Sequence, residues 1–96
     1  MSPLKRKKLS KIRSELDKLD NSLIKLIKKR TNLVNKVLAL KEKKNQIVDQ
    51  KRIKKILNNI KKKSLKNNID PKITNRIWKN MIWSYIDFER RNFKKK

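Results

Sequence analysis

The sequence predicts an all-α protein whose subunit has three helices, one long and two shorter, and which forms a helical homodimer. Apolar residues recur at steps of three, four and seven from residue 9 to residue 40, which is typical of one long amphipathic helix. The chain has only 96 residues, and a single domain of this size buries a modest fraction of its surface. So long a helix has too little partner surface within its own subunit, and we expect a second copy alongside it.

The long helix is expected over residues 9–40, because neither proline nor glycine interrupts the pattern there. Its apolar stripe consists of Leu9, Ile12, Leu16, Leu19, Leu23, Leu26, Leu33, Val37 and Leu40. The preceding residues 1–8 are basic, and we expect them to form an N-terminal tail before a helical domain of residues 9–93.

A second helix is expected after residues 43–48, which break the apolar pattern. Asp49 can cap it, since an aspartate side chain accepts hydrogen bonds from the free backbone N–H groups of a first helical turn. Its apolar stripe consists of Ile53, Ile56, Leu57 and Ile60. Residues 64–69 are mostly polar and are expected to connect it to the next helix.

The third helix is expected to begin at Asp70 and Pro71, with aspartate at the N-cap and proline at the first helical position. Apolar residues then recur at helical spacing to about Phe93, and they are Ile73, Ile77, Met81, Ile82, Tyr85, Ile86 and Phe88. The last three residues, 94–96, are lysines and are expected to form a basic C-terminal tail.

The composition excludes several kinds of chemistry. There is no cysteine and no histidine, which excludes disulfides, thiolate metal sites and the commonest general base. There is no glycine, which phosphate-cradling loops need for close backbone approach. We therefore expect neither a metal nor a cofactor. No apolar run reaches the roughly 18 residues of a membrane span, and no signal peptide is recognisable. We expect no membrane partner and a cytoplasmic location.

A pocket is predicted on the long helix. Arg30 and Lys41 are 11 residues apart, so they differ by only about 20° around the helix axis. Val34 and Val37 lie between them on the same face, which suits a pocket with apolar walls and a cation at each end. Arg13 lies about 100° away from Arg30 by the same arithmetic, so it is better placed to reach the pocket of a partner subunit.

A single carboxyl is predicted on the apolar face of the third helix. Ile82, Tyr85 and Glu89 follow a spacing of three and four residues and therefore share one face. On the second helix, Arg52 follows Asp49 by three residues and should project from the first turn.

The order and spacing of these residues resembles the all-helical (type II) chorismate mutases over roughly residues 9–92. The residues that carry the resemblance are Arg13, Leu19, Asp20, Arg30, Lys41, Val48, Asp49, Arg52 and Glu89. The resemblance implies an enzyme, an isomerase that converts chorismate to prephenate by a cofactor-free Claisen rearrangement. This reaction belongs to phenylalanine and tyrosine biosynthesis in the shikimate pathway. The resemblance also implies an intertwined helical homodimer in which an arginine from one subunit completes the active site of the other.

The resemblance implies a role for each site residue. Arg13 of the partner subunit and Arg30 would clamp the carboxylates of the substrate, a dicarboxylate. Lys41 and Glu89 would act on the ether oxygen as the catalytic pair. Further substrate contacts would come from Asp49, mainly through its backbone, from Arg52 and from Tyr85. The apolar walls would be Val37, Ile56, Ile82 and Ile86.

Glu89 stands where many members of the family carry glutamine. An ionised carboxylate only accepts hydrogen bonds, so Glu89 must be protonated to help an oxygen that gains negative charge. We therefore expect activity to fall as the pH rises through the titration of Glu89.

Two other positions do not decide whether the substrate is chorismate or isochorismate. Ile53 follows Arg52 at a position where the typical mutase has a glutamate that contacts the ring hydroxyl. Tyr85 occupies a position where a serine is often found in the family. Both are similar to the isochorismate-pyruvate lyases, which share the fold and form salicylate. Isochorismate-pyruvate lyase activity is thus the alternative prediction for the enzyme.

The charge supports a rival class, a basic helical nucleic-acid-binding protein. The formal net charge is +23, which favours polyanionic partners. The second helix is rich in lysine, at Lys51, Lys54, Lys55, Lys61, Lys62 and Lys63. However, basic residues occur along every segment, and no aromatic residues alternate with them as a stacking platform requires. Adenine-rich codons, which encode lysine, asparagine and isoleucine, explain the charge equally well. We expect nucleic acid to bind only nonspecifically.

Overall fold

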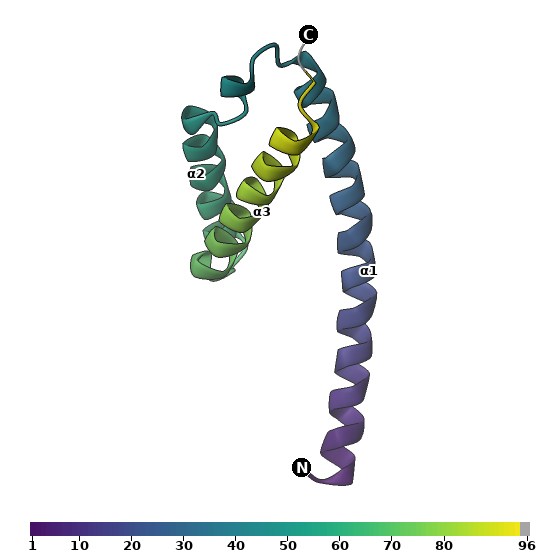
Figure 1. Cartoon of the computed structure of the whole chain (residues 1–96). Helices are drawn as coiled ribbons and strands as arrows, with labels where there is room; N and C mark the ends of the chain where they lie inside the picture. Colours follow the sequence, from purple (N-terminus) through teal and green to yellow (C-terminus); the bar gives the residue numbers. More distant parts are fainter. Residues whose placement is uncertain (95–96) are drawn as a thin grey trace. The chain divides into compact units, whose positions relative to one another are not determined.

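The structure is a computed structural model that describes residues 1–94 (Figure 1). It contains the helices α1 (Pro3–Leu40), α2 (Gln50–Lys66) and α3 (Pro71–Asn92), and a short 3-10 helix at Lys44–Gln46. No strand occurs in the described range, so the predicted all-α class with one long and two shorter helices is confirmed. The predicted homodimer stays a prediction. By its internal contacts the chain divides into two compact parts, Met1–Leu33 and the chain from Val34 onward.

The first part, Met1–Leu33, is a single helix apart from its first two residues. The helix begins at Pro3 rather than at residue 9, so residues 3–8 of the expected tail are helical. Ser2 is the reason, because its Oγ accepts a hydrogen bond from the backbone N–H of Lys5 at 3.2 Å, and Pro3 occupies the first helical position.

A single helix has no core of its own. The apolar stripe of this part is accordingly about half exposed, with relative exposures of 55% at Ile12, 52% at Leu16 and 61% at Leu19. Such a stripe needs a partner surface before it can contribute to stability.

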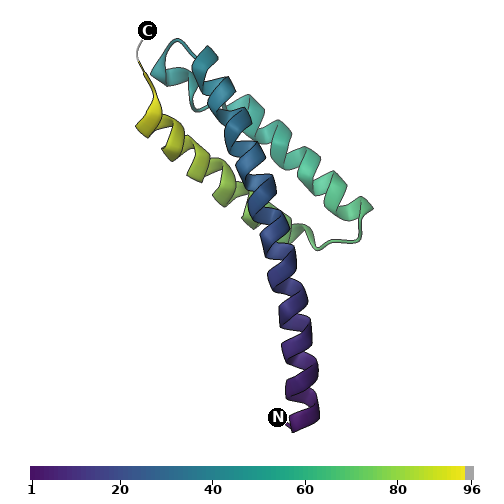
Figure 2. The ribbon, with the colours of Figure 1, turned by 90° about the vertical axis from the view of Figure 1, so that its right-hand side faces the viewer.

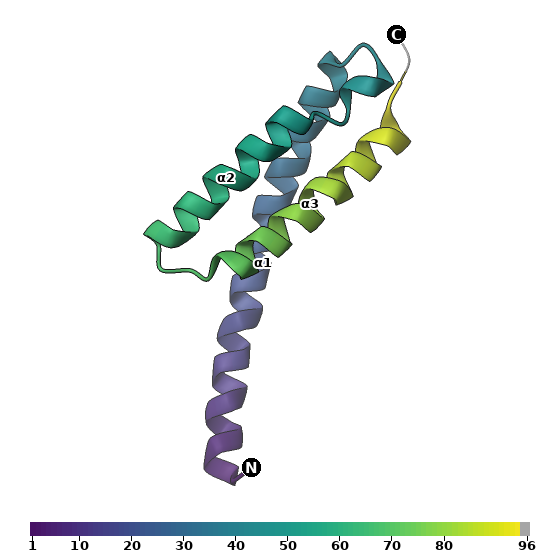
Figure 3. The ribbon, with the colours of Figure 1, turned by 90° about the vertical axis from the view of Figure 1, so that its left-hand side faces the viewer.

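The second part has a small apolar core where the last turn of α1 and the 3-10 segment meet α3. Leu38, Ile47, Ile82 and Ile86 are buried there. Partly buried side chains pack around them, namely Val48, Ile53, Ile56, Leu57 and Phe93. Within this part, α2 and α3 run side by side in opposite directions, as Figures 2 and 3 show.

The start of α2 agrees with the prediction. The side chain of Asp49 accepts a hydrogen bond from the backbone N–H of Arg52 at 3.0 Å, so Asp49 is the N-cap.

The end of α2 differs from the prediction. The helix continues to Lys66, whereas we expected a connector from residue 64. Asn68 takes the left-handed conformation, with φ of 56°. The backbone N–H of Ile69 donates to the carbonyl of Ser64 at 2.8 Å and that of Asn68 donates to the carbonyl of Leu65 at 3.2 Å. These two bonds form a Schellman motif, which satisfies carbonyls that the helix end leaves free.

Ser64 is therefore a buried helical residue, with 3% of its surface exposed. Its hydroxyl donates to the carbonyl of Ile60 at 2.6 Å and also lies 2.6 Å from the hydroxyl of Thr74 on α3. This pair joins α2 to α3 near the turn that connects them.

The predicted start of α3 is confirmed. Asp70 caps the helix by accepting from the backbone N–H of Lys72 at 2.9 Å, and Pro71 stands at the first helical position. The helix ends at Asn92, close to the expected Phe93. Of the predicted C-terminal tail, residues 95 and 96 lie outside the described residues. No helix within residues 1–94 is long and apolar enough to cross a membrane.

Candidate active site

The candidate site centres on an ion pair between Lys41 and Glu89. The Nζ of Lys41 donates to both carboxylate oxygens of Glu89, at 3.1 Å to Oε2 and 3.3 Å to Oε1. Lys41 follows directly after α1, and Glu89 lies in the last turns of α3, so the pair joins residues 48 positions apart. The structure thus brings together two residues that were predicted to act on the same substrate atom.

The pair is partly shielded from water. Relative exposure is 18% for the side chain of Lys41 and 8% for that of Glu89. Ile86 and Ile82, on the same face of α3 as Glu89, are also buried. The carboxyl group thus stands at the edge of the apolar core, where charge interactions are screened less than at the surface. This is the environment that the spacing of Ile82 and Glu89 predicts.

An open groove of about 630 Å³ lies beside the pair and reaches Lys41. Its lining residues are Val37, Leu40, Lys41, Gln46, Val48, Asp49, Gln50 and Lys51. The groove combines apolar walls with amide, carboxylate and ammonium groups, a composition that suits a small anionic ligand. The groove is open to solvent and does not by itself enclose a ligand.

Asp49 and Arg52 meet at the start of α2. The carboxylate of Asp49 is occupied as the helix cap, which leaves its backbone for any ligand contact. The side chain of Arg52 is exposed. Of the four predicted walls, Val37 lines the groove, whereas Ile56, Ile82 and Ile86 belong to the apolar core or pack against it.

Tyr85 lies one helical turn before Glu89 and is half-buried. Its ring meets that of Phe88 edge to face, with centroids 6.5 Å apart and an interplanar angle of 89°. An aromatic contact fixes the ring, so its position on α3 is defined by packing.

Arg13 and Arg30 both lie on α1, in the part of the chain that ends at Leu33. Their predicted roles as carboxylate clamps stay predictions.

Gln46 is a residue that the sequence reading did not identify. Its Oε1 accepts hydrogen bonds from the backbone N–H groups of Glu42 at 2.7 Å and Lys43 at 2.9 Å. These bonds hold the bend after α1, and Gln46 also lines the groove. The sequence signal was weak, because glutamine is not a usual turn residue.

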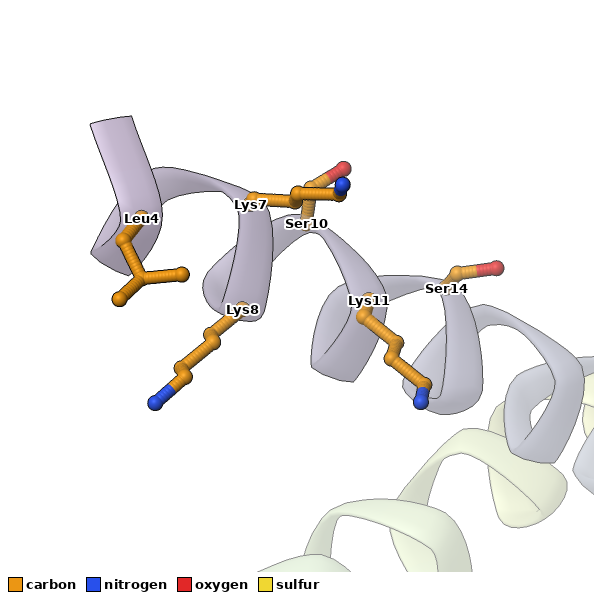
Figure 4. Close-up of a pocket in the computed structure, with 6 residues that line it drawn as sticks. All are labelled: Leu4, Lys7, Lys8, Ser10, Lys11 and Ser14. Carbon is orange, nitrogen blue, oxygen red and sulfur yellow. The ribbon is translucent and has the colours of Figure 1, made fainter.

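Another hollow lies along the first turns of α1, where Lys7, Lys8 and Lys11 extend from the helix (Figure 4). All its lining residues come from this one helix, so no opposite wall exists to hold a ligand. Within residues 1–94, no group of three or more aspartate, glutamate, histidine or cysteine side chains gathers as a metal site would require.

Comparison with known proteins identifies a family for this chain. The family model described as chorismate mutase type II matches residues 12–90, which include every site residue discussed above. A search of curated proteins found no match, and neither did a search of solved structures.

Proposed function

This chain belongs to the chorismate mutase type II family, which is all-helical, and from that premise we propose that it converts chorismate to prephenate. The observation that carries the proposal is the ion pair of Lys41 and Glu89 at the edge of an open groove. The enzyme would be an isomerase of phenylalanine and tyrosine biosynthesis in the shikimate pathway. It would act in the cytoplasm as a homodimer.

The reaction requires neither a proton acceptor nor a nucleophile. In the Claisen rearrangement the ether carbon–oxygen bond breaks while a new carbon–carbon bond forms within the same molecule, so all atoms and electrons stay in the substrate. The protein must hold the reactive conformer and stabilise negative charge that develops on the ether oxygen. Lys41 supplies this charge stabilisation as an ammonium donor.

Glu89 supplies a second donor when it carries a proton. In the free protein both oxygens of Glu89 accept from Lys41, which is the arrangement of an ionised carboxylate. A bound dianion takes the ammonium of Lys41 for its own oxygen and adds negative charge near Glu89. Only the protonated form of Glu89 has an O–H that can donate to the ether oxygen.

The remaining predicted residues bind and orient the substrate. Arg30, together with Arg13 of the partner subunit, would clamp the two carboxylates, since the planar guanidinium binds a carboxylate through two parallel hydrogen bonds. Arg52 and the backbone of Asp49 would add contacts at the start of α2. Tyr85 would lie against the substrate beside the apolar walls.

Two features support the homodimer. Met1–Leu33 presents an apolar stripe on a helix without a core of its own, and the groove at Lys41 is open to solvent. A second subunit would cover apolar surface and provide Arg13 at the same time.

The proposal is tested by adding purified protein to chorismate and identifying the product. The loss of chorismate absorbance with formation of prephenate supports it, provided that the Lys41→Met variant loses the activity while its helical circular dichroism is retained. Unchanged chorismate at high protein concentration contradicts it.

A lyase acting on isochorismate is the second candidate, and Ile53 is the residue that favours it. An isoleucine side chain has no carboxyl group to accept a hydrogen bond from the ring hydroxyl, and Ile53 packs against the apolar core. Tyr85 on α3 agrees with the same reading.

Isochorismate should therefore be offered in parallel with chorismate. Release of pyruvate and salicylate would identify the lyase. The variant Ile53→Glu should then shift the ratio of the two activities toward the mutase, and Leu57→Met, a volume-conserving change on the same helix, serves as its control.

A further inference from the structure

The exposed side of α2 carries positive charge without any compensating acid. Residues 50–69 contain no aspartate or glutamate. The same segment contains eight basic residues, all of them exposed: Lys51, Arg52, Lys54, Lys55, Lys61, Lys62, Lys63 and Lys66. The other long stretches without an acidic residue, 1–14, 21–41 and 71–86, contain six, six and three basic residues, so the segment of α2 contains the most.

The packing of α2 places these charges. Its apolar residues turn toward the core, and Ser64 turns toward α3. At about 100° per residue, Lys55, Lys62 and Lys66 lie within roughly 40° of one another on the opposite side of the helix. We call these three residues the outer ridge. Lys55 and Lys66 are separated by about 16 Å along the axis, at 1.5 Å per residue.

The ridge is not neutralised within the protein. Among the described residues, the recorded ion pairs are Lys41 with Glu89, and Arg91 with Asp87 on α3 at 2.9 Å. None of the basic residues of α2 takes part in either. Three like charges on one helix side repel each other, and they are most stable when an external polyanion lies against them.

From this arrangement we propose that the outer ridge of α2 binds the phosphodiester backbone of a nucleic-acid strand without reading its base sequence. Lysine is a point charge that contacts phosphate from many directions, which suits a backbone and not a bidentate base contact. Binding releases the counterions that the strand has condensed, and this release provides the driving force.

The side chains around the ridge favour a strand over a lipid surface. Membrane-surface helices need an apolar face free to enter the bilayer, and the apolar face of α2 is packed within the protein. On the exposed side of α2, Leu65 is the single apolar residue. Asn58 and Asn59 separate Lys55 from Lys62, and their amides can donate to phosphate oxygens.

The test must separate a local site from general basicity, since any protein of this charge is retained by polyanions at low salt. Binding to labelled single-stranded RNA and to duplex DNA is therefore measured by anisotropy between about 50 and 200 mM salt. The proteins compared are the unmodified chain, a ridge variant (Lys55→Gln, Lys62→Gln, Lys66→Gln) and a control (Lys7→Gln, Lys8→Gln, Lys11→Gln). The control removes the same charge from the first turns of α1 (Figure 4).

The ridge variant is expected to lower the slope of log Kobs against log salt by about 2 to 3, at roughly 0.7 per phosphate for a single strand and 0.9 for a duplex. The control should change the slope by less than one such contact. The probe for which the ridge variant loses more affinity, single-stranded RNA or duplex DNA, identifies the type of nucleic acid that the ridge binds. Circular dichroism and thermal melting should be unchanged in both variants, because all six lysines are exposed.

An equal decrease of the salt slope in the ridge variant and in the control would overturn the proposal. Binding would then depend on the total charge of the protein and not on the position of the lysines. The proposal would also be overturned if the ridge variant kept its nucleic-acid affinity but lost binding to anionic phospholipid vesicles.

Discussion

The ammonium group of Lys41 lies within hydrogen-bond distance of both carboxylate oxygens of Glu89, at 3.1 and 3.3 Å. This geometry neutralises two charges at the edge of a small apolar core. It also means that the groups proposed to act on the substrate are, in the free protein, partners of each other. In the proposed mechanism, a bound substrate would compete with Glu89 for the N–H donors of Lys41.

The variant Glu89→Gln tests the protonation proposal. The rate of the unmodified enzyme should fall as the pH rises, because only the protonated carboxyl donates to the ether oxygen. An amide donates at every pH, so the pH–rate profile of the variant should be flat over the same interval. The measurement is kcat/KM for chorismate across the pH range in which the protein stays folded.

The matched control is Asp87→Asn, which removes an exposed carboxylate from the same helix and its contact with Arg91. Its profile should follow that of the unmodified enzyme. If Glu89→Gln retains the original pH dependence, Glu89 is not the titrating group.

The variant Lys41→Met tests the electrostatic contribution of the ammonium. Methionine keeps the length of the apolar stem but donates no hydrogen bond. Removal of one such donor typically costs roughly 3 to 4 kcal/mol, or 10²- to 10³-fold in kcat. Lys44→Met, a few residues away and exposed, should leave kcat unchanged. A loss of less than threefold in kcat for Lys41→Met would remove Lys41 from the mechanism.

Mixing two inactive variants tests whether the site is shared between subunits. Arg13→Ala and Arg30→Ala should each be nearly inactive as homodimers. In a mixed dimer one site combines an intact Arg30 with an intact Arg13 of the other chain, and the second site lacks both. With random exchange half of the dimers are mixed, so about a quarter of the unmodified activity should return. No recovery after subunit exchange, verified by mass spectrometry, would argue against a shared site.

A double-mutant cycle tests the contact of Ser64 with Thr74. The two hydroxyls are 2.6 Å apart and connect α2 with α3. Ser64→Ala and Thr74→Val should each lower the free energy of unfolding by about 1 kcal/mol, the usual net value of such a bond. The double variant should lose about 0.5 to 1.5 kcal/mol less than the sum. Strict additivity in urea unfolding would show that the hydroxyls do not interact energetically.

The three helices could be predicted because local signals and apolar spacing agree. Asp49 and Asp70 cap helices as expected, and the stripe of Ile82, Ile86 and Glu89 faces the interior. The beginning of α1 was missed for a definite reason. The spacing marks where apolar residues begin, whereas the cap at Ser2 decides where the helix begins.

Long-range partners were less accessible to sequence reasoning. Ser64 was expected in a connector because serine, lysine and asparagine are common in loops. Its burial depends on a contact with Thr74, ten residues later, and no local sequence pattern predicts that contact. Lys41 and Glu89 could be paired only through the family resemblance, since spacing within one helix says nothing about a side chain on another.

Asn68 shows how a chain without glycine ends a helix. The left-handed conformation at this position is open to glycine without steric cost, and asparagine is the next most tolerant residue. Asparagine is encoded by adenine-rich codons and glycine by guanine-rich ones. A genome that drifts toward adenine therefore reaches the same backbone geometry through a slightly strained residue. An asparagine at such a position lowers the free energy of unfolding slightly relative to glycine. The variant Asn68→Gly should therefore raise the melting temperature of this protein.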